Sequence, residues 1–146
     1  MKRIRVAGII PMEDGFAFMH RVGVKKRNDI QDYYTFPGGG LEEGETPEEG
    51  AKREIKEEFG INVEIVKKLY EMDIEKFDQK EIFFLCKYID GEFGTGDGPE
   101  FSGNPKYIDS GEYIPEIIKR EEIEGLLLLP PQIKEKLLED LNNNKF

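Results

Sequence analysis

The sequence predicts a single α/β domain, a sandwich of mixed strands around one central helix and one terminal helix. Three observations support this fold class. Apolar, β-branched segments recur along the chain, an acidic segment near the middle has clear helix-start and helix-end signals, and a second amphipathic helix follows the last strand. The 146 residues suffice for one domain with a substantial core, so we expect residues 1–146 to form one domain.

The segments before the central helix predict three strands. Residues 4–10 are apolar and β-branched, and Asp14-Gly15 is a turn signal that predicts a hairpin with residues 16–22. A short aromatic strand over residues 33–36 ends before Pro37, and the glycines at 38–40 predict a loop that runs to the helix.

The central helix is expected over Pro47–Phe59, because signals at both of its ends agree. Thr46 can cap the helix, Pro47 suits the first helical position, and Glu49 completes a capping box. Gly60 can adopt the left-handed conformation that ends many helices.

The second half of the chain predicts further strands and one helix. Residues 63–73, 81–89 and 113–119 are strand candidates, and the Gly- and Pro-rich segment 91–112 is expected to be a long loop. Apolar residues at helical spacing then predict an amphipathic C-terminal helix, namely Ile133, Leu137, Leu138 and Leu141.

The formal net charge of −10 limits the choice of partners. An acidic surface repels phosphate backbones, so we expect no long nucleic acid as a partner. The lone cysteine, Cys86, lies in an apolar run and is expected in the core rather than in a disulfide. No run approaches the ~18 apolar residues of a membrane span. We expect a cytoplasmic protein with no membrane partner, as a monomer or a homodimer.

Three carboxylates share one face of the central helix. Glu54 is three and four residues from Glu57 and Glu58, which places all three on one stripe. Ala51, Ile55 and Phe59 form the opposite, core-facing stripe. An acidic stripe is either a solvated face or a site for a hard cation such as Mg²⁺, which prefers carboxylate oxygens and water. The helix alone favours the solvated face.

The loop before the helix favours the cation site. Glu45 follows Gly39 by six residues, and Arg53-Glu54 begins eight residues after Glu45. With the residues that follow, this pattern resembles the Nudix box, a glycine loop and acidic helix that binds metal and the pyrophosphate of a substrate. The box spans residues 39–61, about a sixth of the chain, and follows Phe36-Pro37-Gly38. Its matching positions are Gly39, Glu45, Arg53, Glu54, Ile55, Glu57, Glu58, Gly60 and Ile61.

The resemblance implies a Nudix-type α/β/α sandwich and hydrolysis of a phosphoanhydride bond in a small nucleotide-like substrate, with Mg²⁺ or Mn²⁺ as cofactor. Glu54, Glu57 and Glu58 would bind the metal, one of them acting as base, and the Gly39 carbonyl would be a further ligand. Arg53 would orient a carboxylate. Glu45 would tie the loop to the helix or reach the metal through water.

Substrate contacts are less constrained by the sequence. Arg21, before a basic stretch at 25–27, is either a phosphate-binding cation or a surface strand residue. Glu100 lies in the long loop, where many relatives keep an extra acidic group. His20 is expected to pack within its strand. Four aromatic residues could stack a base, although ordinary packing is the simpler interpretation for each: Tyr33, Tyr34, Phe101 and Tyr107.

Two other classes of function compete with the enzyme. Some Nudix-like domains have lost catalysis and act as ligand sensors or interaction modules, but these usually lack box carboxylates that are all present here. A purely structural acidic helix would not explain the glycine loop before it. Neither the box nor the remaining sequence selects one substrate within the family.

Overall fold

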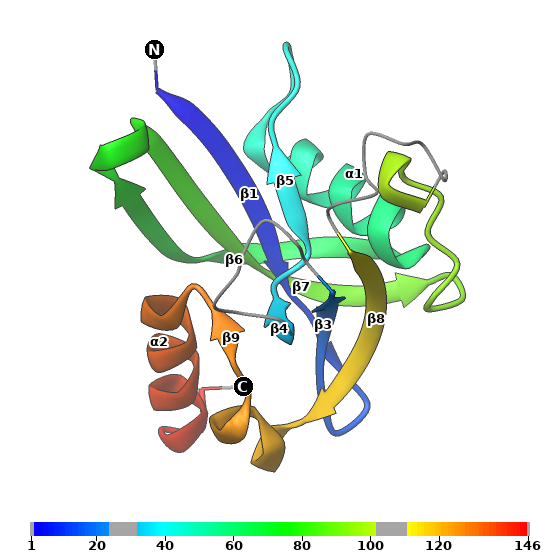
Figure 1. Cartoon of the computed structure of the whole chain (residues 1–146), viewed down its shortest axis with the longest axis vertical. Helices are drawn as coiled ribbons and strands as arrows, with labels where there is room; N and C mark the ends of the chain where they lie inside the picture. The colour runs from blue at the N-terminus through cyan, green and yellow to red at the C-terminus, as the bar shows by residue number, and fades with distance from the viewer. Residues whose placement is uncertain (1, 24–31, 102–110, 146) are drawn as a thin grey trace.

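The computed structural model describes residues 2–23, 32–101 and 111–145, which form two mixed sheets (Figure 1). In the first sheet the strand order is β5 (Gly38–Gly40), β1 (Arg3–Ile9), β7 (Gln79–Asp90) and β6 (Asn62–Ile74). The second has the order β2 (Pro11–Met12), β3 (Gly15–Val22), β4 (Asp32–Thr35) and β9 (Leu128–Leu129), with β8 (Glu112–Lys119) also paired to β3. Among the described residues, three 3₁₀ helices connect elements: η1 (Glu75–Phe77), η2 (Pro99–Phe101) and η4 (Arg120–Gly125).

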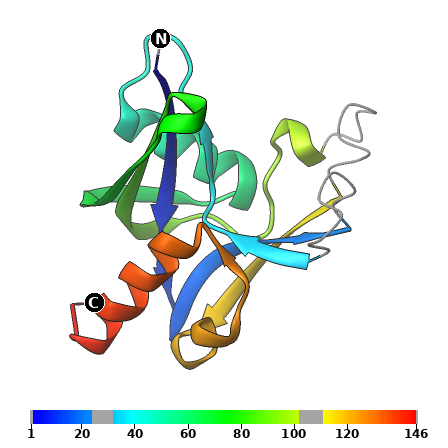
Figure 2. The same cartoon turned by 60° about the vertical axis from the view of Figure 1, so that its left-hand side comes forward.

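The helices α1 (Pro47–Phe59) and α2 (Pro131–Asn142) lie on opposite sides of the strands (Figures 1 and 2). Alternate residues of β7 show why. Phe84 and Cys86 pack in the cluster that contains Ile55 of α1, whereas Phe83 packs in the cluster that contains Ile133 of α2. Both faces of β7 are therefore apolar, and one helix packs over each of them. The arrangement confirms the predicted α/β/α sandwich and the core position of Cys86.

Helix α1 forms where its local signals predict. The Thr46 hydroxyl accepts from the Glu49 amide at 3.2 Å, and the Glu49 carboxylate accepts from the Thr46 amide at 3.1 Å. Gly60 ends the helix at φ 77° and donates to the Lys56 carbonyl. In the part of the chain that the structure describes, no helix is both long and apolar enough to cross a membrane.

Two predictions for the first half of the chain were wrong. The glycines at 38–40 form strand β5 rather than a loop, pairing antiparallel with β1. A side chain at Gly38 would collide with the backbone carbonyl of Val6, so glycine permits this close approach. The expected hairpin is also limited to β2 and β3, because β1 pairs with β5 and, in parallel, with β7.

Candidate active site

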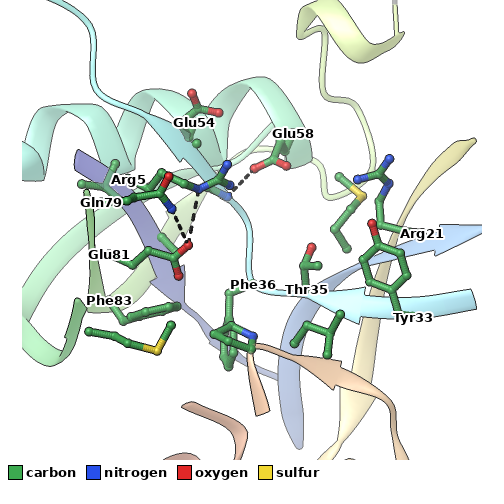
Figure 3. Close-up of a pocket in the computed structure, with 18 of the residues that line it drawn as sticks. Arg5, Arg21, Tyr33, Thr35, Phe36, Glu54, Glu58, Gln79, Glu81 and Phe83 are labelled. Carbon is green, nitrogen blue, oxygen red and sulfur yellow. Dashed lines mark hydrogen bonds and ion pairs between the residues drawn. The ribbon is translucent and has the colours of Figure 1, made fainter. Parts of the chain in front are cut away.

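A cavity of about 480 Å³ lies between the two sheets, beside the inner face of α1 (Figure 3). Most of its polar side chains form three parts: Glu54 and Glu58 on α1, Arg21 on β3, and a group on β1 and β7. The remaining lining is mostly aromatic and aliphatic, including Phe36, Tyr33, Met72, Ile74, Phe83, Tyr113, Leu129 and Pro130. The cavity volume falls within the ~300–1,000 Å³ that is usual for small-molecule sites.

Glu58 is a carboxylate held inside the protein at the cavity wall. Its side chain is on the inner face of α1, and the residue is only 8% exposed. One oxygen, Oε2, accepts a hydrogen bond from the backbone amide of Gly38 at 2.6 Å. Because burying an ionised group is costly unless it is hydrogen-bonded or neutralised, this placement favours a role beyond surface solvation.

Gly39 and Glu54 lie in direct contact. A Cβ atom at Gly39 would be 2.6 Å from Oε1 of Glu54, closer than real Cβ atoms approach any atom. The absence of a side chain therefore lets the backbone of β5 lie against this carboxylate. Both residues line the cavity, so oxygen atoms of α1 and the backbone of β5 meet at one place.

Arg53 joins the loop before α1 to the helix. Its Nε donates to Oε2 of Glu45 at 2.6 Å, and one terminal nitrogen donates to Oε1 of the same carboxylate at 3.1 Å. It also donates to the Gly40 carbonyl at 3.1 Å, Glu54 at 3.0 Å and Glu57 at 3.2 Å. Hydrogen bonds from Arg53 lower the pKa of the Glu45 carboxyl. In turn, the carboxylates of Glu45 and Glu54 raise the pKa of the Arg53 guanidinium.

The predicted box residues thus occupy two places. Glu54, Glu58 and Gly39 line the cavity. Arg53 and Glu45 form the supporting network, and Glu57 is bound to Arg53. Within residues 2–23, 32–101 and 111–145, no three His, Cys, Asp or Glu side chains are grouped to hold a metal ion. The donors still fit Mg²⁺ chemically, since this ion is usually bound by one or two carboxylates with waters and substrate phosphates.

Arg21 lines the same cavity as these carboxylates. It is near the end of β3, and its Cζ atom lies 3.7 Å from the centroid of the Tyr113 ring and 5.9 Å from that of Tyr33. Stacking on an aromatic face fixes the plane of a guanidinium and leaves its N–H edge to meet anions. The structure thus places Arg21, Glu54 and Glu58 around one cavity.

Other candidates lie elsewhere. Glu100 belongs to η2, but its side chain lies outside the described residues, as do the basic stretch at 25–27 and Tyr107. His20 packs within the second sheet, as expected, with its ring stacked on Tyr34 at a centroid distance of 4.2 Å.

Sequence reasoning missed the third polar part of the cavity, which consists of Arg5, Gln79 and Glu81. Arg5 lies opposite Glu81 in the parallel register of β1 and β7. In the sequence, Arg5 and Glu81 are charged residues that directly precede the apolar parts of their strands. Their proximity depends on a pairing between segments far apart in the sequence, which local pattern does not reveal.

Comparisons with known proteins agree on one family. A family model described as NUDIX domain matches residues 1–129. The chain is 34% identical over 116 residues to an 8-oxo-dGTP diphosphatase of Haemophilus influenzae, covering 75% of this chain and 81% of that protein. A 60-residue stretch is 43% identical to an RNA pyrophosphohydrolase of Helicobacter pylori, covering 41% of this chain and 38% of that protein. A crystal structure of a NUDIX hydrolase from Nitrosomonas europaea superposes with a TM-score of 0.73 at 20% identity, over 97% of this chain and 70% of that one.

Proposed function

Because the chain belongs to the Nudix hydrolase family, we propose that it hydrolyses a phosphoanhydride bond in a small nucleoside di- or triphosphate derivative. The supporting observation is that Glu54, Glu58 and Arg21 line one cavity. Carboxylates can hold a cation there while the guanidinium receives phosphate oxygens. Such an arrangement accommodates a polyanion on a protein whose net charge is −10.

We propose that Mg²⁺, or Mn²⁺ in its place, is the cofactor. When bound, the metal neutralises phosphate charge and lowers the pKa of a coordinated water. Glu54 and Glu58, which line the cavity, would hold it, with the Gly39 carbonyl oxygen as a further ligand. Glu57 would become a further ligand if it gave up its hydrogen bond from Arg53. One of the three carboxylates takes the proton of the attacking water.

The remaining proposed residues position these groups. Arg53 ties Glu45, in the loop before α1, to the helix and orients the carboxylate of Glu54. Arg21 donates to the substrate phosphates, oriented by its stacking on Tyr113. Glu100 remains a substrate-binding proposal from the sequence. Electrostatic groups fixed before the reaction are the main contribution that a protein makes to phosphoryl chemistry.

A small nucleotide is the favoured substrate class. The match to the 8-oxo-dGTP diphosphatase extends over 75% of this chain, whereas the match to the Helicobacter RNA pyrophosphohydrolase covers 41%. A polymeric substrate would also meet an acidic protein, which gains little from counterion release. Such a substrate fits a cytoplasmic enzyme, and we propose that location.

Pyrophosphohydrolysis of RNA is the second candidate, because several relatives are named RNA pyrophosphohydrolase. A substrate panel separates the two. Nucleoside triphosphates, 8-oxo-dGTP, ADP-ribose, nucleotide sugars, dinucleoside polyphosphates and 5′-triphosphorylated RNA are incubated with Mg²⁺, Mn²⁺ or excess EDTA. We expect metal-dependent release of phosphate or pyrophosphate from a small nucleotide. Far faster cleavage of RNA would favour the second candidate, and tight binding without any turnover would indicate a sensor.

A further inference from the structure

The wall of the cavity formed by β1 and β7 contains a fixed carboxylate. Glu81 is on β7, and its side chain is only 18% exposed. Its Oε1 accepts a hydrogen bond from Nε2 of Gln79 at 3.1 Å and lies 3.7 Å from Nε of Arg5. Figure 3 shows this group on the side of the cavity away from Arg21 and Tyr33. These contacts orient the carboxylate without enclosing it.

The two oxygens of Glu81 are not equivalent. Among the described residues, both contacts reach Oε1, and Oε2 has no hydrogen-bond partner. Phe83 and Met72, which also line the cavity, supply apolar surface beside it. A carboxylate accepts hydrogen bonds at both oxygens, and each oxygen has two lone pairs. This wall therefore suits a flat ligand that presents N–H donors to Glu81.

Arg5 adds the opposite polarity next to that acceptor. Its guanidinium has five N–H donors in one plane, so it can contact Glu81 and still donate to a ligand. The Arg5 side chain is 42% exposed. The wall thus offers an acceptor and a donor side by side. Among the common nucleobases, only guanine places two adjacent N–H donors, N1–H and the exocyclic amine, beside a carbonyl, O6.

We propose that Glu81 accepts hydrogen bonds from N1–H and the exocyclic amine of a guanine-type base, while Arg5 donates to its O6. The inference rests on the proposed function, since it places the base on this wall and the phosphates near Glu54, Glu58 and Arg21 of the same cavity. An 8-oxoguanine base has the same edge, so this assignment covers oxidised and ordinary guanine nucleotides alike.

The test compares GTP with ITP, which differ only in the exocyclic amine. For the native protein with saturating Mg²⁺ we expect kcat/KM to favour GTP by about tenfold or more, as for a hydrogen bond lost to a charged group. In Glu81→Gln the preference should fall to within about threefold, because an amide has one acceptor oxygen. Glu64→Gln makes the same change on the exposed side of β6, outside the cavity, and should keep the native preference.

Two further measurements keep the outcome clear. Arg5→Met should lower kcat/KM for GTP and ITP by similar factors, because both bases contain O6; this variant also serves if Glu81→Gln does not fold. Equilibrium binding of GMP and IMP should show the same preference as turnover, and it does not depend on the chemical step.

Three results would overturn the assignment: equal use of GTP and ITP, a preference that Glu81→Gln leaves unchanged, or CTP or ATP as the best common substrate. If no nucleotide is hydrolysed but GMP still binds better than IMP, the proposed function fails while the base site stands.

Discussion

Replacing Arg53 by methionine should uncouple the glycine loop from α1. Arg53 makes five hydrogen bonds of 2.6 to 3.2 Å, two to Glu45 and one each to Glu54, Glu57 and the Gly40 carbonyl. Methionine has a similar length but no donor and no charge. Its introduction would leave three carboxylates close together without the cation that they share.

The expected loss of stability is about 3 kcal/mol. A hydrogen bond to a charged group contributes about 1.5–3 kcal/mol when buried, but the Arg53 side chain is 22% exposed and its bonds share one guanidinium, so they do not add. A domain with about 5–15 kcal/mol of stability should therefore remain folded. Arg53→Lys keeps the positive charge but not the planar arrangement of N–H donors, so its loss of stability should be about half as large.

Urea unfolding as a function of pH measures this effect. Arg53 lowers the pKa of Glu45 in the folded state, so the stability from this carboxylate is fully present above about pH 4.3, the ordinary value of a glutamate. That stability is lost as pH falls through the lowered folded-state pKa. The difference between native protein and Arg53→Met should therefore be largest near pH 7 and shrink in acid.

Lys52→Met is the matched control, because it removes one positive charge from an exposed position on the same helix. It should change the free energy of unfolding by less than about 0.5 kcal/mol. If Arg53→Met is as stable as this control at pH 7, or if its deficit does not change with pH, Arg53 does not hold the loop as described.

Three further predictions concern the cavity and strand β5. Glu57→Gln and Glu58→Gln should each lower turnover at saturating Mg²⁺ by about a hundredfold or more while the protein stays folded; near-native turnover in both would remove them from the metal site. Arg21→Ala should lower kcat/KM about tenfold, and a change within twofold would make Arg21 a surface residue. Gly38→Ala should lower the free energy of unfolding, measured by thermal unfolding, by about 1–3 kcal/mol, because its Cβ would collide with the backbone of β1. Gly40→Ala is the control and should be nearly neutral, because its Cβ would meet nothing closer than 3.5 Å. Equal losses of stability in the two variants would contradict the close packing of β5 against β1.

Local chemistry explains which elements the sequence could predict. Helix α1 has its capping residues and its C-terminal glycine within one continuous segment, so its bounds follow from neighbours in sequence. The same segment contains the box carboxylates, and the helical period alone places Glu54 and Glu58 on one face.

Elements that depend on distant pairing could not be predicted in this way. Strand β5 consists of three glycines, a residue that is depleted in strands. These glycines form a strand only because they pair antiparallel with β1. The contact between Arg5 and Glu81 likewise follows from the register of β1 and β7. The sequence therefore indicated the end of the cavity that we propose to bind metal, and it did not reveal the wall that we assign to the base.

The central claim is that the carboxylates of α1 in this cavity support metal-dependent phosphoanhydride hydrolysis. Its most direct test is the rate of phosphate or pyrophosphate release from the best nucleotide of the panel, for native protein and Glu58→Gln, over a titration of Mg²⁺. We expect the native rate to rise from the EDTA baseline to saturation, and the variant to stay at least about a hundredfold lower at every concentration. A native rate independent of Mg²⁺, or a variant that reaches the native rate, would contradict the claim.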